Sequence, residues 1–251
     1  MKVFFIGAGP GDPELLTIKG QKIIKRAEIV IYAGSLINKE ILNFAKDRAK
    51  IYDSSKMSLN EITKIFNKAK EKDATIARIH SGDPSLYSAI QEQIDWCEKE
   101  KIPYEVIPGV SSFSAAAAKI KQELTLPGVS QSVILTRISG RTKVPPREDI
   151  ALLARAKTTM VIFLSIQEID KVVTKLLTEY SSETPVAIIY KVSWPEEKII
   201  QGNLSNIAQK VKEAKVTHQA IILVGEVLKK KYQKSRLYNA SFTHSFRKAK
   251  K

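Results

Sequence analysis

The stretch that decides the fold is a turn between two regular elements, His80-Ser81-Gly82-Asp83-Pro84-Ser85-Leu86-Tyr87. The apolar residues 74–79 before it predict a β-strand, and residues 85–97 predict a helix. Open α/β sheets bind their ligands where strands end and helices begin. The stretch therefore marks a candidate ligand site, although a plain structural turn capped by Asp83 or Ser85 would give the same pattern.

A second loop of the same kind opens the chain, Gly7-Ala8-Gly9-Pro10-Gly11-Asp12-Pro13, directly after the apolar residues 3–6. Strands and helices are predicted to alternate around the two loops. A capping box at Ser58 and Glu61 predicts the start of one helix. This alternation predicts a mainly parallel sheet with helices on both faces. The expected strands cover residues 29–32, 51–52 and 104–107, and the expected helices cover residues 14–26 and 59–69.

The alternation of predicted strands and helices stops at residues 123–131, where Pro127-Gly128 indicates a crossing between domains. A second capping box, Ser165 to Glu168, precedes an apolar helical stripe at residues 169–176. Short connections between the last strands favour antiparallel pairing there. The expected strands cover residues 132–136, 159–164, 186–190, 198–201 and 220–224.

The expected organisation has four parts. An N-terminal α/β domain covers residues 1–122, and a linker covers residues 123–131. A C-terminal α/β domain with a mixed sheet covers residues 132–228, and residues 229–251 form a basic tail expected to be disordered.

The composition is that of a soluble globular protein, with 43% hydrophobic and 27% charged residues among 251. No apolar run approaches the ~18 residues that span a bilayer, so we expect a cytoplasmic protein with no membrane partner. Cys97 is the single cysteine and the three histidines are scattered, so neither a disulfide framework nor a metal cluster is predicted.

The net charge of +15 is concentrated at the end of the chain. Residues 229–251 carry nine Lys or Arg and no acidic residue, which leaves +6 on the rest. The tail is interpreted as a solvated appendage, with an RNA-binding arm that stacks bases on its aromatic residues as the alternative. Because most of the excess charge lies in the tail, a nucleic-acid partner is not favoured.

The first loop suits some ligands better than others. A G-x-G-x-G string after a strand is typical of a dinucleotide site. Asp12 stands where that fingerprint requires Gly, however, and Pro10 and Pro13 lack amide donors. There is no P-loop string either. A loop with few donors and many carbonyls suits a ligand that carries positive charge, amine and hydroxyl groups, such as S-adenosyl-methionine.

Three ordered motifs carry a resemblance to a known family: residues 7–17, residues 81–84 and Pro108-Gly109-Val110-Ser111-Ser112. From residue 2 to about 228 the chain resembles the tetrapyrrole methylase family. Further strings are similar to its members that methylate carbon C11 of precorrin-4 or cobalt-precorrin-4. These strings are residues 32–36, 80–87, 124–131, 135–137 with 140–142, 159–160 with 162–165, and 194–197.

The resemblance implies two α/β domains with S-adenosyl-methionine in the cleft between them, a homodimer, and methyl transfer that yields (cobalt-)precorrin-5 in cobalamin biosynthesis. Asp83 is the expected polar anchor for ribose hydroxyl groups or the ligand's amine. The implied cofactor contacts are Pro10, Ser81, Gly82, Asp83, Leu86, Ser111, Ser112, Leu164 and Val192.

The implied substrate carries many carboxylates, which basic side chains pair with well. Arg137, Arg141 and Lys191 are the candidates, with solvated surface charge as the alternative. His80 adjoins the second loop and is either a macrocycle contact or an interior histidine. Any cobalt would belong to the substrate.

Catalysis by positioning is expected, without an assigned catalytic residue. Two other functions remain open at this point: a ribosomal RNA methyltransferase of the same fold, and a non-enzymatic RNA-binding protein.

Overall fold

The computed structural model describes residues 1–229 and 231–249. The chain forms two compact units. Unit 1 holds residues 1–116 together with the short segment 191–197, and unit 2 holds residues 117–190 and the chain from residue 198 onward. Helix α4, Ser112–Lys119, begins in unit 1 and ends in unit 2.

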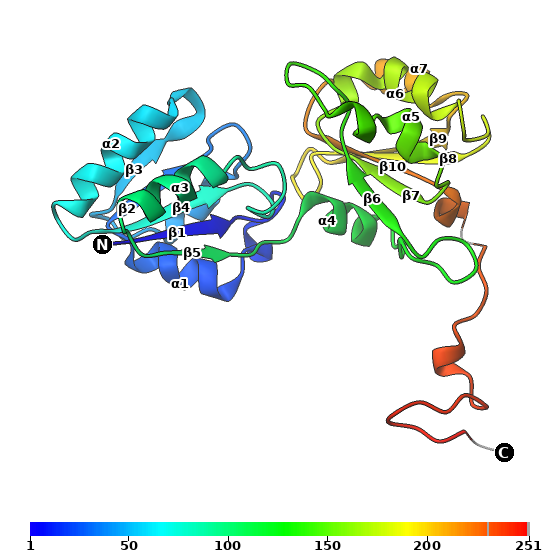
Figure 1. Cartoon of the computed structure of the whole chain (residues 1–251), viewed down its shortest axis with the longest axis horizontal. Helices are drawn as coiled ribbons and strands as arrows, with labels where there is room; N and C mark the ends of the chain where they lie inside the picture. Colours follow the sequence, from blue (N-terminus) through cyan, green and yellow to red (C-terminus); the bar gives the residue numbers. More distant parts are fainter. Residues whose placement is uncertain (230, 250–251) are drawn as a thin grey trace. The chain divides into compact units, whose positions relative to one another are not determined.

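Unit 1 is a five-stranded parallel sheet in the order β3-β2-β4-β1-β5. Helix α1 covers one face of this sheet, and helices α2 and α3 cover the other (Figure 1). Alternate residues of β1 face opposite sides, so Phe4 packs in a cluster with residues of α1, while Phe5 packs in the cluster that contains residues of α2 and α3. The strands are Lys2–Gly7 (β1), Ile29–Tyr32 (β2), Lys50–Asp53 (β3), Thr75–His80 (β4) and Tyr104–Ile107 (β5). The helices are Ile18–Arg26 (α1), Leu59–Lys70 (α2) and Gln91–Lys99 (α3).

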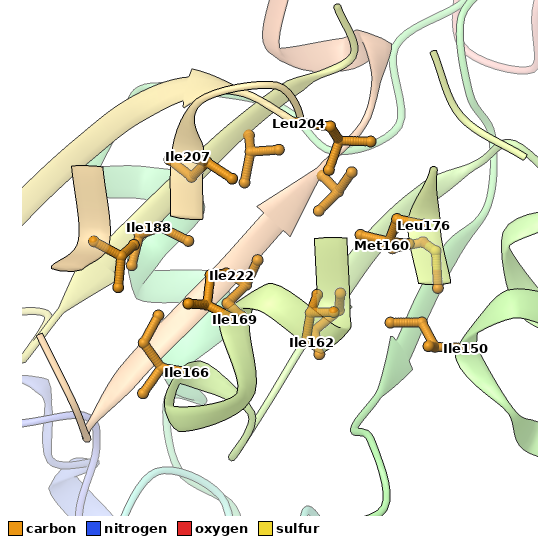
Figure 2. Packing of buried hydrophobic residues seen from close by; sticks show 14 of the residues in the cluster. Ile150, Met160, Ile162, Ile166, Ile169, Leu176, Ile188, Leu204, Ile207 and Ile222 are labelled. Carbon is orange, nitrogen blue, oxygen red and sulfur yellow. The ribbon is translucent and has the colours of Figure 1, made fainter. Parts of the chain in front are cut away.

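Unit 2 is a mixed five-stranded sheet in the order β6-β7-β10-β8-β9, in which only β6 and β7 pair in parallel. Helices α5, α6 and α7 contribute to one apolar cluster with β7, β8 and β10, where Met160, Ile188 and Ile222 are fully buried (Figure 2). The strands are Val133–Thr136 (β6), Thr159–Ile162 (β7), Pro185–Tyr190 (β8), Lys198–Asn203 (β9) and Ala220–Val224 (β10). The helices are Ile150–Ala154 (α5), Ile169–Leu176 (α6) and Ile207–Glu213 (α7).

The predicted fold class is therefore confirmed: a parallel α/β sheet is followed by a second, mixed one. The capping box of α2 is also confirmed, since Glu61 N–H donates to Ser58 Oγ and Ser58 N–H donates to Glu61 Oε2 at 2.8 Å. Short 3₁₀ turns lie at Pro13–Leu15, Lys39–Phe44, Ser54–Lys56, Pro146–Glu148, Ile166–Glu168, Glu226–Lys229 and Arg236–Tyr238.

Two predicted helices begin later than expected. Residues 14–26 do not form one helix, because Pro13–Leu15 is a 3₁₀ turn and Thr17 caps α1 by accepting from Gly20 N–H. Residues 85–90 are not helical either. Tyr87 and Ala89 have φ values of 56° and 49°, which a right-handed helix excludes, so α3 starts only at Gln91.

The predicted capping box at Ser165 is wrong. The Ser165 hydroxyl donates to Phe163 O at 2.6 Å and accepts from Ile138 N–H at 3.0 Å, so it ties the end of β7 to the segment after β6. A 3₁₀ turn follows and α6 begins at Ile169. The apolar stripe is confirmed, with Ile169, Val172 and Leu176 buried.

In the tail, Arg247 donates to the carbonyls of Leu237 and Asn239, both at 2.7 Å. Gln233 N–H donates to Pro127 O at 3.0 Å. Three of the nine tail cations lie outside the described residues, namely Lys230, Lys250 and Lys251. Within the described ranges, no helix has the length and apolar character needed to cross a membrane.

Candidate functional site

Three loops that contain glycine lie at the carboxyl ends of the neighbouring strands β1, β4 and β5 in unit 1. We call them the first (residues 7–13), second (residues 81–84) and third (residues 108–112) glycine loops. A Cβ on Gly7 would lie 2.6 Å from Gly109 Cα and from Gly82 O. A Cβ on Gly109 would overlap Gly82 O. Only glycine at positions 7 and 109 lets the three backbones approach this closely, so these loops are built as one edge of the sheet.

The first two loops are also joined by backbone hydrogen bonds. Gly9 N–H donates to Gly82 O at 3.2 Å, and Gly82 N–H donates to Gly9 O at 2.7 Å. Ala8 N–H donates to His80 O at 2.8 Å. The amide N–H groups of residues 8 and 9 therefore donate to other backbone groups of the protein. They are not available to bind the diphosphate of a dinucleotide.

Asp83 joins the second loop to the third. Its Oδ1 accepts from Ser85 N–H at 2.8 Å, and its Oδ2 accepts from Gly109 N–H at 2.9 Å. An ionised carboxylate has about four acceptor positions, so two remain for a ligand. The side chain expected as a ligand anchor is therefore also the bridge between loops, which the sequence did not indicate.

Three serine residues lie close in sequence to the two residues that form this bridge: Ser81 precedes Asp83, and Ser111 and Ser112 follow Gly109. No hydrogen bond of the described residues uses the hydroxyl group of Ser81, Ser111 or Ser112. Ser111 is buried, and the other two are half-buried, as are Pro10 and Leu86. Together with Asp83 these groups can donate to and accept from a ligand that carries hydroxyl and amine groups.

The segment 191–197 of unit 1, which we call the tryptophan loop, contacts the first glycine loop. Trp194 Nε1–H donates to Pro10 O at 2.9 Å, and Asp12 N–H donates to Ser193 Oγ at 2.9 Å. Val192 is 4% exposed. The Lys191 ammonium lies 5.4 Å from the centre of the Trp194 ring and 3.4 Å from Glu196 Oε1. Sequence reasoning noted this loop as a motif but missed the long-range contact.

His80 lies inside unit 1, at the end of β4. It is 3% exposed, its ring centre is 6.2 Å from that of Phe5, and its Nε2 has no hydrogen-bond partner among the described residues. Burial and the nearby Arg78 charge lower the pKa of His80 to about 3, so the ring is neutral. The structure thus places His80 as an interior side chain, and its contact with the macrocycle stays a prediction.

Arg78 and Gln93 form a buried polar pair that sequence reasoning missed. Arg78 Nε–H donates to Gln93 Oε1 at 3.0 Å, and Gln93 Nε2–H donates to Ala89 O at 3.4 Å. Burial lowers the pKa of Arg78 to about 10, which leaves it charged at neutral pH. The pair links β4, helix α3 and the loop between them. Nothing in the apolar pattern of the strand marks Arg78 except its own charge.

In unit 2, Leu164 follows β7 and is 72% exposed with a φ of 53°. Arg137 follows β6 and holds its own loop, since its guanidinium donates to the carbonyls of Ile138, Thr142 and Lys143 at 3.1–3.2 Å. Arg141 is exposed in that loop. Pairing of these arginines with substrate carboxylates stays a prediction, and Arg141 has the more accessible charge.

Unusual backbone conformations divide into two groups. Positive φ values at Asp73, Lys101, Lys121, Lys157 and Lys215 follow helices, where such residues end a helix. The remaining non-glycine cases are Tyr87, Ala89, Leu164, Lys191, Ser193 and Gln219. All but Gln219 lie in the segments described above. Left-handed backbone at non-glycine residues costs ~1–3 kcal/mol each and concentrates at functional sites, so this distribution independently marks the same segments.

Among the residues that the structure describes, no three His, Cys, Asp or Glu side chains come together in a group that could hold a metal ion. The fold and the site thus define a class: a two-unit α/β protein in which three glycine loops at one edge of a parallel sheet are joined by backbone hydrogen bonds and by the carboxylate of Asp83.

Within that class, residues 2–208 match the family model described as tetrapyrrole (corrin/porphyrin) methylases. The chain belongs to the tetrapyrrole methylase family, as the motifs predicted. A cobalt-precorrin-4 C(11)-methyltransferase of Methanocaldococcus jannaschii is 51% identical over all of this chain and 97% of its own. A precorrin-4 C(11)-methyltransferase of Pseudomonas aeruginosa is 42% identical over 98% of this chain and 99% of its own.

Solved structures are similar as well. An X-ray structure of a cobalt precorrin-4 methyltransferase, described as a cobalamin biosynthetic enzyme, has a TM-score of 0.89 and 38% identity over 90% of this chain and 95% of its own. A uroporphyrin-III C-methyl transferase from Thermus thermophilus, complexed with S-adenosyl homocysteine, shares the fold with a TM-score of 0.78 and 24% identity. That alignment covers 92% of this chain and all of the other.

Proposed function

We propose that this protein is a methyltransferase that moves a methyl group from S-adenosyl-methionine to carbon C11 of precorrin-4 or cobalt-precorrin-4, giving the corresponding precorrin-5 in cobalamin biosynthesis. The observation that carries the proposal is full-length similarity, at 42% and 51% identity, to proteins named for this reaction. The glycine loops support the proposal as well, because Asp83 keeps two acceptor positions there for a ligand.

The cofactor contacts proposed here are those that the family resemblance implies. Asp83 has acceptor positions left for ribose hydroxyl groups or the amine of the donor, and Ser81, Ser111 and Ser112 have hydroxyl groups to offer. Leu164 presents apolar surface in a strained backbone. The full proposed set is Pro10, Ser81, Gly82, Asp83, Leu86, Ser111, Ser112, Leu164 and Val192.

The chemistry needs little from the protein beyond placement. The bound sulfonium supplies an activated methyl group, and the electron-rich tetrapyrrole supplies the carbon nucleophile. The protein's part is to hold donor and acceptor in line, ~3–3.5 Å apart, with water excluded. Arg137, Arg141 and Lys191 are proposed to pair with substrate carboxylates. A proton is released overall, and no side chain is assigned as its acceptor.

The test is turnover with each form of the substrate. Protein, S-adenosyl-methionine and either precorrin-4 or cobalt-precorrin-4 should give a product heavier by one methyl group, with one S-adenosyl-homocysteine released per product. Faster turnover of one form would identify the natural substrate. No methylation of either form by folded protein would overturn the proposal.

The charge of +15 favours a second candidate, methyl transfer to ribosomal RNA. That reaction needs cations to track a phosphate backbone up to the cofactor loops, whereas nine of the cations lie in residues 229–251. A labelled methyl group offered with ribosomal RNA and tetrapyrrole together should reach only the tetrapyrrole. Label in the RNA alone would favour the second candidate.

The assembly and the compartment are further proposals. We infer a homodimer in the cytoplasm, from the family resemblance. Light scattering on the purified protein should give twice the 28.0 kDa chain mass, and a monomer mass at micromolar concentration would contradict the dimer.

A further inference from the structure

We propose that Trp194 is a positioning residue, through which the tryptophan loop locks the first glycine loop in the shape that the methyl-donor site needs. This inference rests on the proposed function of that site. It concerns a side chain that does not itself contact the cofactor in the proposed assignment.

Two hydrogen bonds hold the first glycine loop, one on each side of Gly11. The indole Nε1–H of Trp194 donates to Pro10 O at 2.9 Å, and the Ser193 hydroxyl accepts from Asp12 N–H at 2.9 Å. These residues are more than 180 positions apart in the chain. Two bonds at alternate residues fix both the position and the direction of the backbone between them.

The space around Gly11 is the second observation. A Cβ on Gly11 would overlap the Trp194 ring at Cδ1 and Nε1. The φ angle of Gly11 is not in the left-handed region, unlike those of Gly9 and Gly82. Glycine is therefore required at position 11 to admit the indole and not to relieve the backbone. Gly11 and Trp194 form one matched pair.

The tryptophan loop is itself held in an unfavourable conformation. Lys191 and Ser193 have φ values of 44° and 65°, which cost ~1–3 kcal/mol each. Ser193 N–H donates to Glu197 Oε2 at 2.8 Å, and the Lys191 ammonium lies 5.4 Å from the centre of the Trp194 ring. Strain that persists needs compensating contacts, and the bonds to the glycine loop are among them.

The chemistry of Pro10 explains why the hydrogen bond from Trp194, which we call the lock, is useful. Proline has no amide N–H, so its carbonyl is the only backbone group through which the protein can hold it. That carbonyl is the acceptor for Trp194. Releasing it should let residue 10 move away from the cofactor while the chemistry of transfer, once the cofactor is bound, stays the same. The lock should therefore act on cofactor affinity and leave the maximal rate nearly unchanged.

The first experiment compares Trp194→Phe with Trp96→Phe in calorimetric titration with S-adenosyl-homocysteine and in steady-state turnover. Phenylalanine keeps an aromatic ring but lacks the donor, so affinity should fall about 5- to 10-fold, the usual effect of one lost hydrogen bond. The kcat value at saturating cofactor should stay within about twofold. Trp96 is the matched control, because it is the other of two tryptophans and packs on Phe66 of α2, with ring centres 5.4 Å apart.

The second experiment tests the pair itself. In a Trp96→Phe background Trp194 is the sole tryptophan, so its fluorescence reports the lock without any ligand. Gly11→Ala should displace the indole, shift its emission to the red and weaken S-adenosyl-homocysteine binding. In a Trp194→Ala background the same Gly11→Ala change should have almost no further effect on binding, because the atoms it would collide with are gone.

The possible results distinguish a failure of the positioning role of Trp194 from a failure of the proposed function. If the unaltered protein binds the ligand and Trp194→Phe binds it equally well, the positioning role is wrong. An equal cost of Gly11→Ala in both backgrounds would also overturn it. If the unaltered, folded protein binds no S-adenosyl-homocysteine, the proposed function fails, and the positioning role fails with it.

Discussion

Asp83 is the residue at which the site's geometry converges, because its two oxygens hold amides of two different loops. Replacing it with alanine should lower S-adenosyl-homocysteine affinity at least tenfold and the free energy of unfolding by about 1–3 kcal/mol, since two amides lose a charged acceptor. Asp83→Asn, which keeps one acceptor oxygen, should lie between. Calorimetric titration and urea unfolding measure the two effects.

The matched control for Asp83 is Asp95→Ala, an exposed carboxylate on α3 that bonds to Gln91 Nε2. That change should leave ligand affinity unaltered. Normal binding by Asp83→Ala would refute the anchor role, whatever its stability.

His80 makes a prediction about pH. Its pKa is about 3 in the folded protein against about 6.5 when unfolded, so between these values the unfolded state binds more protons. Its contribution to stability is complete above pH ~6.5 and is lost as the pH falls below that, at up to about 1.4 kcal/mol per pH unit. Urea unfolding at pH 7.5, 6.5 and 5.5 should show this slope in the natural protein and a smaller one in His80→Gln. Identical slopes would mean that His80 titrates normally.

At the scale of elements, Gln93 connects helix α3 to β4 and to the loop between them. Gln93→Leu should lower the free energy of unfolding by about 1.5–3 kcal/mol, because the charged Arg78 guanidinium loses a buried acceptor. Gln91→Ala, an exposed change on the same helix, should cost less than about 0.5 kcal/mol. Denaturant midpoints compare the two, and equal costs would show that the buried pair carries no special weight.

Some element boundaries could be predicted from the sequence and others could not. The start of α2 was predictable because its capping box is local: Ser58 and Glu61 need only each other. The start of α3 was not, because left-handed backbone at Tyr87 and Ala89 has no signature in those residue types. Ser165 matched the same capping pattern, yet its hydroxyl bonds to Phe163 and Ile138. A local pattern fails where a distant partner competes for the same side chain.

The candidate site divides in the same way. The glycine loops were predictable because each follows an apolar strand and carries its own Gly and Pro, with an Asp in the first two. Their mutual contacts, such as Asp83 with Gly109 and Trp194 with Pro10, were not, because they depend on which strands become neighbours. Arg137 shows the limit for charges: the sequence offers a cation after a strand, and the structure shows it holding its own loop.

For the whole molecule, the basic tail is predicted to be dispensable for methyl transfer. Removing residues 229–251 lowers the net charge from +15 to +6. Tetrapyrrole turnover should stay within about twofold, because the tail carries none of the proposed cofactor or substrate residues, while stability falls slightly with the loss of the Gln233–Pro127 hydrogen bond. Kinetics and thermal melting of the shortened chain measure both, and abolished turnover in a folded protein would assign the tail a role in catalysis.

The proposed methyl transfer is tested most directly by following the methyl group itself. The protein would be given S-adenosyl-methionine labelled with ¹³C in its methyl group, together with precorrin-4 or cobalt-precorrin-4, and the product examined by NMR. We expect one labelled methyl group, bonded to carbon C11, in the product of the natural protein, and much less of this product with Asp83→Ala. Label on a different carbon, or none in the tetrapyrrole, would contradict the proposed methyl transfer.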